Sequence, residues 1–263
     1  MRGAKRAKSV STTPSVQGKD KAKELYDLTL NALKPHANTK FAEGMKKYMK
    51  NRFNYLGIQA PTRKEVTKEL WKPLQLTNPD PEFYRELFTL CFESQYREMA
   101  YTAIDFTDRY YLKLLSPDDL PHLEKYTIGQ WWDVTDLLAK YYGIILCKDK
   151  ELREKKNKEY LTHPDMWMRR TSLLYQMKLP STSIDHTLYF TNLTSSLSES
   201  DWFMRKAIGW ALREYSKDNP QTVIDYIRDN KDKLSGLSRR EGLKYISNRP
   251  EKYKHVIIPK GLI

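Results

Sequence analysis

A sequence pattern that returns every 36 residues constrains this chain more than any other feature. Its four clear copies start at Gln95, Trp131, Trp167 and Phe203. Their third residues are Arg97, Asp133, Arg169 and Arg205, and each copy continues into an apolar helical segment. A weaker fifth copy starts at Ser238. A period in the thirties with two helices per unit is typical of an α-solenoid, whose units bury their apolar faces only by stacking. The sequence therefore predicts an all-α fold, an α-α superhelix with the aromatic and charged clusters aligned along one wall.

Prolines predict where the helices of this fold begin and end. Alternating strand-like runs are absent, whereas breaks containing proline recur along the chain. These breaks follow Lys34, Ala60, Asn78, Ser116, His163, Leu179 and Asn219. Pro117 suits the first position of a helix, which needs no N–H donor, and Ser116 suits the N-cap.

The chain is strongly basic, with 46 Lys and Arg residues against 33 Asp and Glu residues and a formal net charge of +13. Residues 1–21 contribute +5, and the remaining +8 belongs to the body. This excess indicates a polyanionic partner, nucleic acid first and an acidic membrane surface second. The repeats are expected to place much of the charge on one wall, through Arg97, Arg169, Arg170, Arg205 and Arg213.

Residues 1–20 differ in composition from the rest of the chain. They are basic and then rich in Ser and Thr, which predicts a disordered tail followed by a single helical-repeat domain over residues 21–263. The basic run at residues 5–8 suits a nuclear address, an arm that touches DNA, or a solvated tail with no specific role.

Cysteine and histidine usage excludes several kinds of site. Cys91 and Cys147 each lie in an apolar run, which predicts two buried thiols in a reducing compartment and no disulfide. The histidines lack the spacing of metal ligands, so a zinc site is not expected. No apolar run approaches the roughly 18 residues of a membrane span. The N-terminus lacks the apolar core of a secretory signal.

The third copy of the repeat carries two acids. Asp133 stands where the other copies have arginine, and Asp136 follows one helical turn later. The helix dipole explains Asp133 well. Asp136 lies deeper in an otherwise apolar stretch, where an isolated carboxylate needs a partner. The candidates are Arg169, Arg170 or a cation bound in the groove.

Two tryptophans accompany this acid. Trp132 and Asp136 are four residues apart and share a helix face, and Trp210 follows Gly209 in the fourth copy. A helical tryptophan is usually a core residue. Two indoles beside a carboxylate, however, suit a cationic planar ligand, because both groups attract positive charge.

Four motifs of the chain resemble those of the AlkD-type DNA alkylation repair glycosylases. They are YMKNRF with LGIQAPTR in residues 48–63, WWDVTD in 131–136, WMRRTSLLYQMK in 167–178 and RKAIGWALREY in 205–215. They follow the family's order and spacing, within residues 23–248. The resemblance implies a solenoid of HEAT-like repeats whose concave basic face cradles duplex DNA. It also implies excision of cationic N3- and N7-alkylated purines without a cofactor.

The resemblance implies roles for single residues as well. The catalytic carboxylate corresponds to Asp136, and the tryptophans of its cleft correspond to Trp132 and Trp210. The DNA-binding positions that the resemblance implies are Tyr48, Arg170 or its neighbour Arg169, Lys178 and Arg213. The repeat pattern adds Arg205 to them.

The predicted function is therefore that of a monofunctional DNA glycosylase. Asp136 would stabilise an oxocarbenium-like transition state or position the attacking water. We expect a monomer that works inside the cell on duplex DNA containing alkylated purines, in a nucleus or in a bacterial cytoplasm. The alternatives are a solenoid that binds damaged DNA without cutting it and a protein-interaction scaffold. The acid in a basic groove favours the enzyme over both, and the basic body favours DNA over a protein partner.

Overall fold

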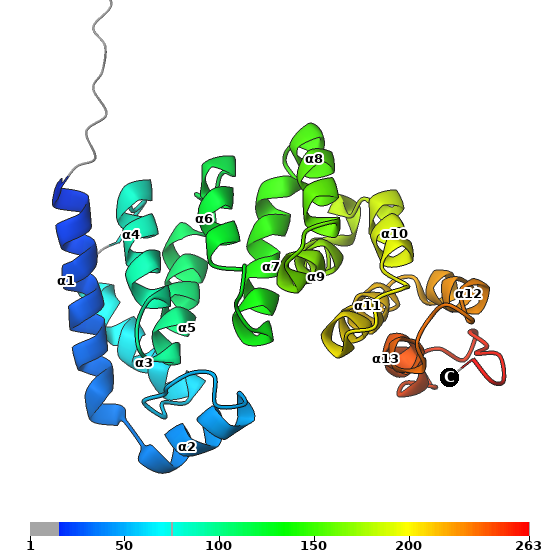
Figure 1. The fold of residues 1–263 in the computed structure, drawn as a ribbon, viewed down its shortest axis with the longest axis horizontal. Coiled ribbons are helices and arrows are strands. Elements are labelled where there is room, and N and C mark those ends of the chain that lie inside the picture. The colour runs from blue at the N-terminus through cyan, green and yellow to red at the C-terminus, as the bar shows by residue number, and fades with distance from the viewer. Residues whose placement is uncertain (1–15, 75, 263) are drawn as a thin grey trace, which may run out of the picture. The chain divides into compact units, whose positions relative to one another are not determined.

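The computed structural model describes residues 16–74 and 76–262 of the chain. These residues form helices and turns, with one isolated β-bridge between Asn54 and Tyr96 and no strand among them. The predicted all-α fold is confirmed (Figure 1). Backbone contacts divide the chain into two compact units, one ending at Leu114 and the other beginning at Leu115. The single domain over residues 21–263 stays a prediction.

The first unit contains α1 to α5. Their bounds are α1 Val16–Leu33, α2 Thr39–Tyr48, α3 Ala60–Trp71, α4 Pro81–Phe92 and α5 Arg97–Phe106. Helix α1 packs against α3 and α4, and α5 packs against the same two helices. Because α1 begins at Val16, residues 16–20 of the predicted tail are helical, and residues 1–15 lie outside the described residues.

A buried glutamate fixes the loop between α2 and α3. The carboxylate of Glu98, a residue that is 1% exposed, accepts hydrogen bonds from the backbone N–H groups of Leu56, Gly57 and Ile58. Gly57 has a φ of +84°, and a Cβ there would lie 2.0 Å from the carbonyl oxygen of Asn38. Only glycine suits such a conformation and such a close approach. Glu98 and Gly57 therefore anchor α2, none of whose own residues is buried.

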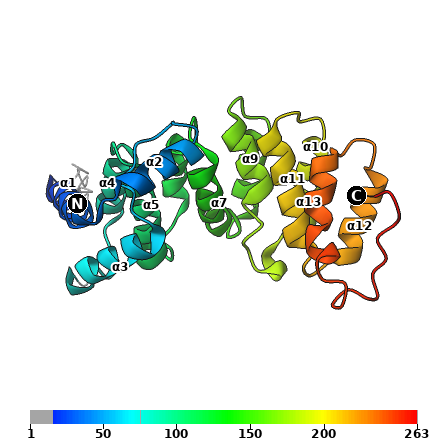
Figure 2. The same ribbon diagram turned by 90° about the horizontal axis from the view of Figure 1, so that it is seen from below.

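The second unit contains α6 to α13, arranged as four successive pairs. The first helices of the pairs are α6 Leu120–Lys125, α8 Lys150–Leu161, α10 His186–Ser195 and α12 Pro220–Asp229. The second helices are α7 Trp132–Leu146, α9 Met166–Leu174, α11 Trp202–Tyr215 and α13 Gly236–Ser247. Each second helix packs against the next, so α7, α9, α11 and α13 form a row (Figure 2). The copies at Trp131, Trp167 and Phe203 mark the starts of α7, α9 and α11, the copy at Gln95 marks the start of α5, and the weaker copy at Ser238 lies in the first turn of α13, which confirms the predicted helical repeat.

The proline breaks are confirmed as helix boundaries. Pro220 occupies the first turn of α12, and Pro117 follows the N-cap Ser116 as predicted. The backbone N–H of Ser116 donates to the Asp119 carboxylate at 3.0 Å. This hydrogen bond satisfies the N–H group that precedes the short helix Pro117–Asp119.

Only one of the two cysteines is buried. Cys91 lies inside α4, is 3% exposed, and has its thiol pKa raised by burial. Cys147 is half-buried, because it is the C-cap residue of α7 and lies beyond the last buried turn of that helix. The prediction of a buried thiol was therefore wrong for Cys147.

Candidate functional site

Three aromatic rings bring the first turns of α7, α9 and α11 together. The ring centroids of Trp131 and Trp167 are 5.4 Å apart, and that of Phe203 lies 5.0 Å from the first and 5.1 Å from the second. These residues occupy the first position of three consecutive copies, so the predicted alignment of the aromatic positions is confirmed in this unit. Because helix N-termini carry partial positive charge, their convergence favours anions nearby.

Asp136 lies beside this convergence and is held by one arginine. Arg170 donates from Nε to Oδ1 at 2.7 Å and from Nη2 to Oδ2 at 2.8 Å. Its remaining terminal nitrogen, Nη1, donates to the carbonyl oxygen of Phe203. The guanidinium therefore joins α7, α9 and α11, and Arg170, one of the predicted candidates, is the partner of Asp136. A two-point contact of this kind fixes the orientation of a carboxylate.

The acid is more accessible than the arginine. The side chain of Arg170 is 5% exposed and that of Asp136 is 12% exposed. Arg170 therefore does not place an exposed charge on a basic wall, because its guanidinium is buried against Asp136. Trp132 is half-buried one turn before Asp136 on α7, so the two share a helix face as predicted. The structure thus offers one oriented, partly exposed carboxylate at the start of the row of second helices.

Trp210 is the centre of a second polar group on α11. Its indole Nε1 donates to Glu214 at 3.4 Å, and Lys178 lies 5.9 Å from its ring centroid. The ammonium of Lys178 is also 4.0 Å from the Glu214 carboxylate. Burial raises the pKa of Glu214, but Lys217, Lys178 and Trp210 outweigh it and hold that pKa below its ordinary value. The predicted residues Trp210 and Lys178 are therefore brought together, through a glutamate that the sequence analysis did not single out.

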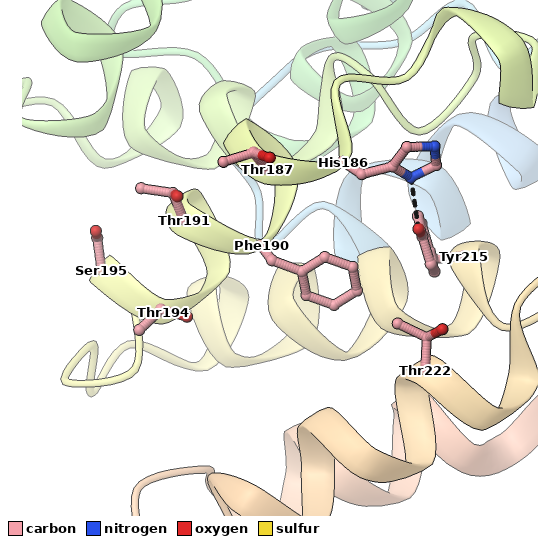
Figure 3. Close-up of a pocket in the computed structure, with 8 residues that line it drawn as sticks. All are labelled: His186, Thr187, Phe190, Thr191, Thr194, Ser195, Tyr215 and Thr222. Atoms are coloured by element: carbon pink, nitrogen blue, oxygen red, sulfur yellow. Dashed lines mark hydrogen bonds between the residues drawn. The ribbon is translucent and has the colours of Figure 1, made fainter.

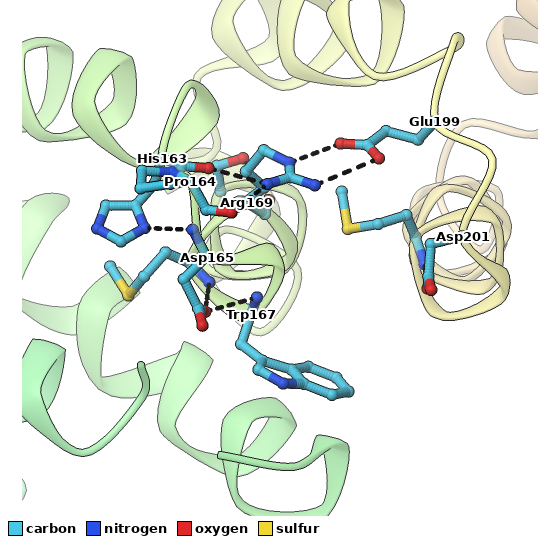
Figure 4. Close-up of polar contacts among 10 residues, drawn as sticks. His163, Pro164, Asp165, Trp167, Arg169, Glu199 and Asp201 are labelled. Carbon is cyan, nitrogen blue, oxygen red and sulfur yellow. Dashed lines mark hydrogen bonds and ion pairs between the residues drawn. The ribbon is translucent and has the colours of Figure 1, made fainter. Parts of the chain in front are cut away.

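Arg169 and Arg205 both bind the segment that leads into α11, and Figure 4 shows the contacts of Arg169. Arg169 forms an ion pair with Glu199 at 2.7 Å and donates to the carbonyl oxygens of His163 and Pro164 at 2.9 and 3.0 Å. Arg205 donates from Nε to the backbone carbonyl oxygen of Glu199 at 3.2 Å. Both arginines therefore hold connecting segments together, and their contacts with DNA stay predictions.

Arg213 is paired with a second glutamate. Its guanidinium lies 2.8 Å from Glu241, which also binds Lys206 at 2.7 Å. Burial raises the pKa of Glu241, but these cations outweigh it, so the pKa is held below its ordinary value. Glu241 lies 36 residues after Arg205, so it is the third residue of a fifth copy that keeps the exact period and starts at Arg239, one residue later than the predicted start at Ser238. Extending the register by one step would have revealed this acid.

Two predicted positions lie in the first unit. Arg97 is 5% exposed, with its guanidinium carbon 3.8 Å from the ring centroid of Phe53. The prediction that Arg97 contributes to an exposed basic wall was wrong, because the side chain is buried by this contact. Tyr48 ends α2 and is 70% exposed, so its ring is available to a partner.

A hollow of about 560 Å³ lies among α10, α11 and the start of α12 (Figure 3). Its described lining consists of hydroxyl and aromatic side chains with one histidine, and His186 Nδ1 is hydrogen-bonded to the Tyr215 hydroxyl at 2.5 Å. None of the predicted catalytic or DNA-binding residues lines it. A lining without cations does not suit a polyanion.

The described part of the chain contains neither a metal-binding cluster nor a helix that could span a membrane. No group of three or more His, Cys, Asp or Glu side chains there is placed to hold a metal ion. None of the helices within residues 16–74 and 76–262 is both long and apolar enough to cross a bilayer.

The stacked second helices carry the oriented carboxylate of Asp136 among arginines and lysines. This arrangement is that of a helical-repeat protein suited to act on a polyanion. The family model described as "DNA alkylation repair enzyme" matches residues 29–246. The chain belongs to this family of DNA repair enzymes, which confirms the predicted resemblance.

One solved structure supports the assignment. The chain is similar to a protein described as "Predicted DNA alkylation repair enzyme from Enterococcus faecalis", with 27% sequence identity and a TM-score of 0.67. The similarity covers 80% of this chain and 97% of the other. No curated protein matches the chain.

Proposed function

We propose that the chain is a monofunctional DNA glycosylase that hydrolyses the N-glycosidic bond of N3-alkyladenine and N7-alkylguanine in duplex DNA. The observation that carries this proposal is the carboxylate of Asp136, oriented through both oxygens by Arg170 and still partly open to solvent. A protein that only binds DNA would need this carboxylate solely as the partner of Arg170, whereas its partial exposure suits contact with a substrate.

The chemistry of the lesion suits a site without a strong acid. A purine alkylated at N3 or N7 is already a cation, so it leaves with the electron pair of the glycosidic bond and becomes neutral. Positive charge then develops on the sugar as an oxocarbenium ion. A fixed carboxylate beside C1′ stabilises that charge as it forms, and it needs no reorganisation because Arg170 has already set its orientation.

Water completes the reaction. Its oxygen bonds to C1′, one proton passes to Asp136 or to solvent, and the product is an abasic site in an intact strand. Trp132 and Trp210 would pack on the sugar and backbone and offer their π faces to the charge, for about 0.5–2 kcal/mol each. Water, and no lysine amine, is the nucleophile, which makes the enzyme monofunctional.

The remaining predicted residues would hold the duplex. Lys178, Arg205 and Arg213 carry cations for the phosphates, and Tyr48 offers an exposed ring. We propose that the enzyme works as a monomer inside the cell, on the DNA itself.

Release of bases from methylated duplex DNA, measured by chromatography, tests this function. Asp136→Asn should lower the rate of release at least about a hundredfold, the usual cost of removing one preorganised electrostatic group. Binding of lesion-free duplex should persist, because the substitution removes a negative charge.

Asp105→Asn is a matched control. Asp105 pairs with Arg63 at 3.0 Å, with side chains 15% and 8% exposed, so the variant loses a similar arginine–carboxylate contact that belongs to the first unit and shares no residue with the proposed site. It should retain release. Near-normal release by Asp136→Asn, or an equal loss in both variants, would remove Asp136 from the reaction.

A further inference from the structure

Three cations surround one aromatic ring near the end of the second unit. Arg249 lies 4.0 Å from the ring centroid of Tyr245, Lys217 lies 5.5 Å from it, and Lys252 lies 5.6 Å from it. Lys217 belongs to the turn after α11, and Tyr245 belongs to α13, which packs beside α11 (Figure 2). Lys252 also lies 5.1 Å from the ring centroid of the buried Tyr253.

Two of the three cations in this cluster have no carboxylate partner among the described residues, whereas several arginines of the unit are paired. Arg169, Arg170 and Arg213 each have a glutamate or aspartate partner. Lys217 has Glu214 at 2.6 Å, shared with Lys178, whereas Arg249 and Lys252 form no ion pair with any residue that the structure describes. Like charges around one ring repel one another, and the cation–π contacts offset only part of that repulsion. A bound anion would relieve that repulsion.

We propose that Lys217, Arg249 and Lys252, grouped around Tyr245, form a phosphate-binding site for the backbone of duplex DNA beyond the site at Asp136. The inference rests on the proposed function in taking duplex DNA as the substrate. Continuity of the surface supports this partner over a small anion. Trp210 and Glu214 are four residues apart on α11, and Glu214 contacts both Lys178 and, in the turn that follows, Lys217, so the cluster adjoins the group formed by Lys178 and Trp210.

The separation of Lys217 from Trp210 indicates which phosphates of the duplex the cluster would bind. The helix carries the chain five residues from Trp210 to its end at Tyr215, about 7.5 Å at a rise of 1.5 Å per residue, and Lys217 follows in the next turn. Since one strand of B-DNA advances 3.4 Å per nucleotide, this is at least about two base pairs. The cluster would therefore hold phosphates that flank the lesion and take no part in the bond cleavage.

The salt dependence of duplex binding tests this site. A labelled, lesion-free duplex is titrated by fluorescence anisotropy over a series of salt concentrations with the full chain. R249A/K252A should lower the slope of log K against log salt by about two, because each phosphate contact contributes about 0.9. R249K/K252R, which keeps both charges, should retain the wild-type slope.

K231A/K233A is the matched control. It removes the same charge from two exposed lysines between α12 and α13, and we expect a slope close to that of the wild type. A slope in R249A/K252A equal to that of this control overturns the proposal. The duplex carries no lesion, so the slope tests this site even if the wild type releases no base. Normal base release with an unchanged slope in R249A/K252A overturns this site alone.

Discussion

Replacing Arg170 by alanine should destabilise the fold far more than replacing an exposed arginine. The side chains of Arg170 and Asp136 are 5% and 12% exposed, so their pair is close to buried. Removing one partner of a buried pair costs about 3–5 kcal/mol, because the other is left uncompensated. Asp136 keeps some contact with solvent, so the lower end, about 3 kcal/mol of the free energy of unfolding, is expected. The Phe203 carbonyl loses its donor in the same variant.

Urea unfolding followed by circular dichroism measures this loss. Arg213→Ala is the comparison, because its ion pair with Glu241 has side chains that are 26% and 14% exposed, and more exposed pairs contribute about 0–1 kcal/mol. The double variant Arg170→Ala/Asp136→Asn should lose less than the sum of the two single variants, since the second substitution removes the uncompensated charge. A loss in Arg170→Ala no larger than in Arg213→Ala, or strictly additive losses, would refute a buried, coupled pair.

Two further predictions concern the close approach of α11 to α13 and the dependence of stability on pH. Gly209→Ala should lower the free energy of unfolding by about 1–3 kcal/mol, because its Cβ would lie 2.6 Å from Glu241 Cβ and 2.9 Å from the Ser238 carbonyl oxygen. A Cβ on Gly44 of α2 would have no heavy atom within 4 Å, so Gly44→Ala should raise the free energy of unfolding by about 0.5–1 kcal/mol. Equal effects of the two substitutions in urea unfolding would contradict the close approach of α11 and α13. Glu241 has a folded-state pKa below its ordinary value of 4.5, so it adds stability above that pH and loses it as pH falls further. Glu241→Gln should therefore be less stable than the wild type at neutral pH, with the difference in Tm closing as pH falls below 4.5, and a constant difference would contradict the shift.

The repeat made much of the fold predictable. Because successive copies are 36 residues apart, Trp131, Trp167 and Phe203 had to occupy equivalent places, and stacking predicts the contacts of Trp167 with each of the other two rings. Prolines marked the helix starts for an equally local reason, since they are tolerated in the first turn and disrupt the interior.

The partner of Asp136 could not be chosen from the sequence. Arg169 and Arg170 are neighbours, but consecutive residues point in directions about 100° apart around a helix. Which of them faces α7 depends on how α7 and α9 pack, and a single sequence does not carry that rotation. Glu199 was missed for a related reason, because it lies in a connecting segment where the helical period gives no direction.

The contact between Trp131 and Phe203 changes how this part of the chain is expected to open. In a simple array each repeat interacts only with its nearest neighbours, so repeats can unfold separately from an end. Here the first and third of three successive second helices touch directly, and Arg170 on the middle helix binds both. The first turns of α7, α9 and α11 therefore form one cooperative unit, and local opening that exposes Asp136 must disrupt all three.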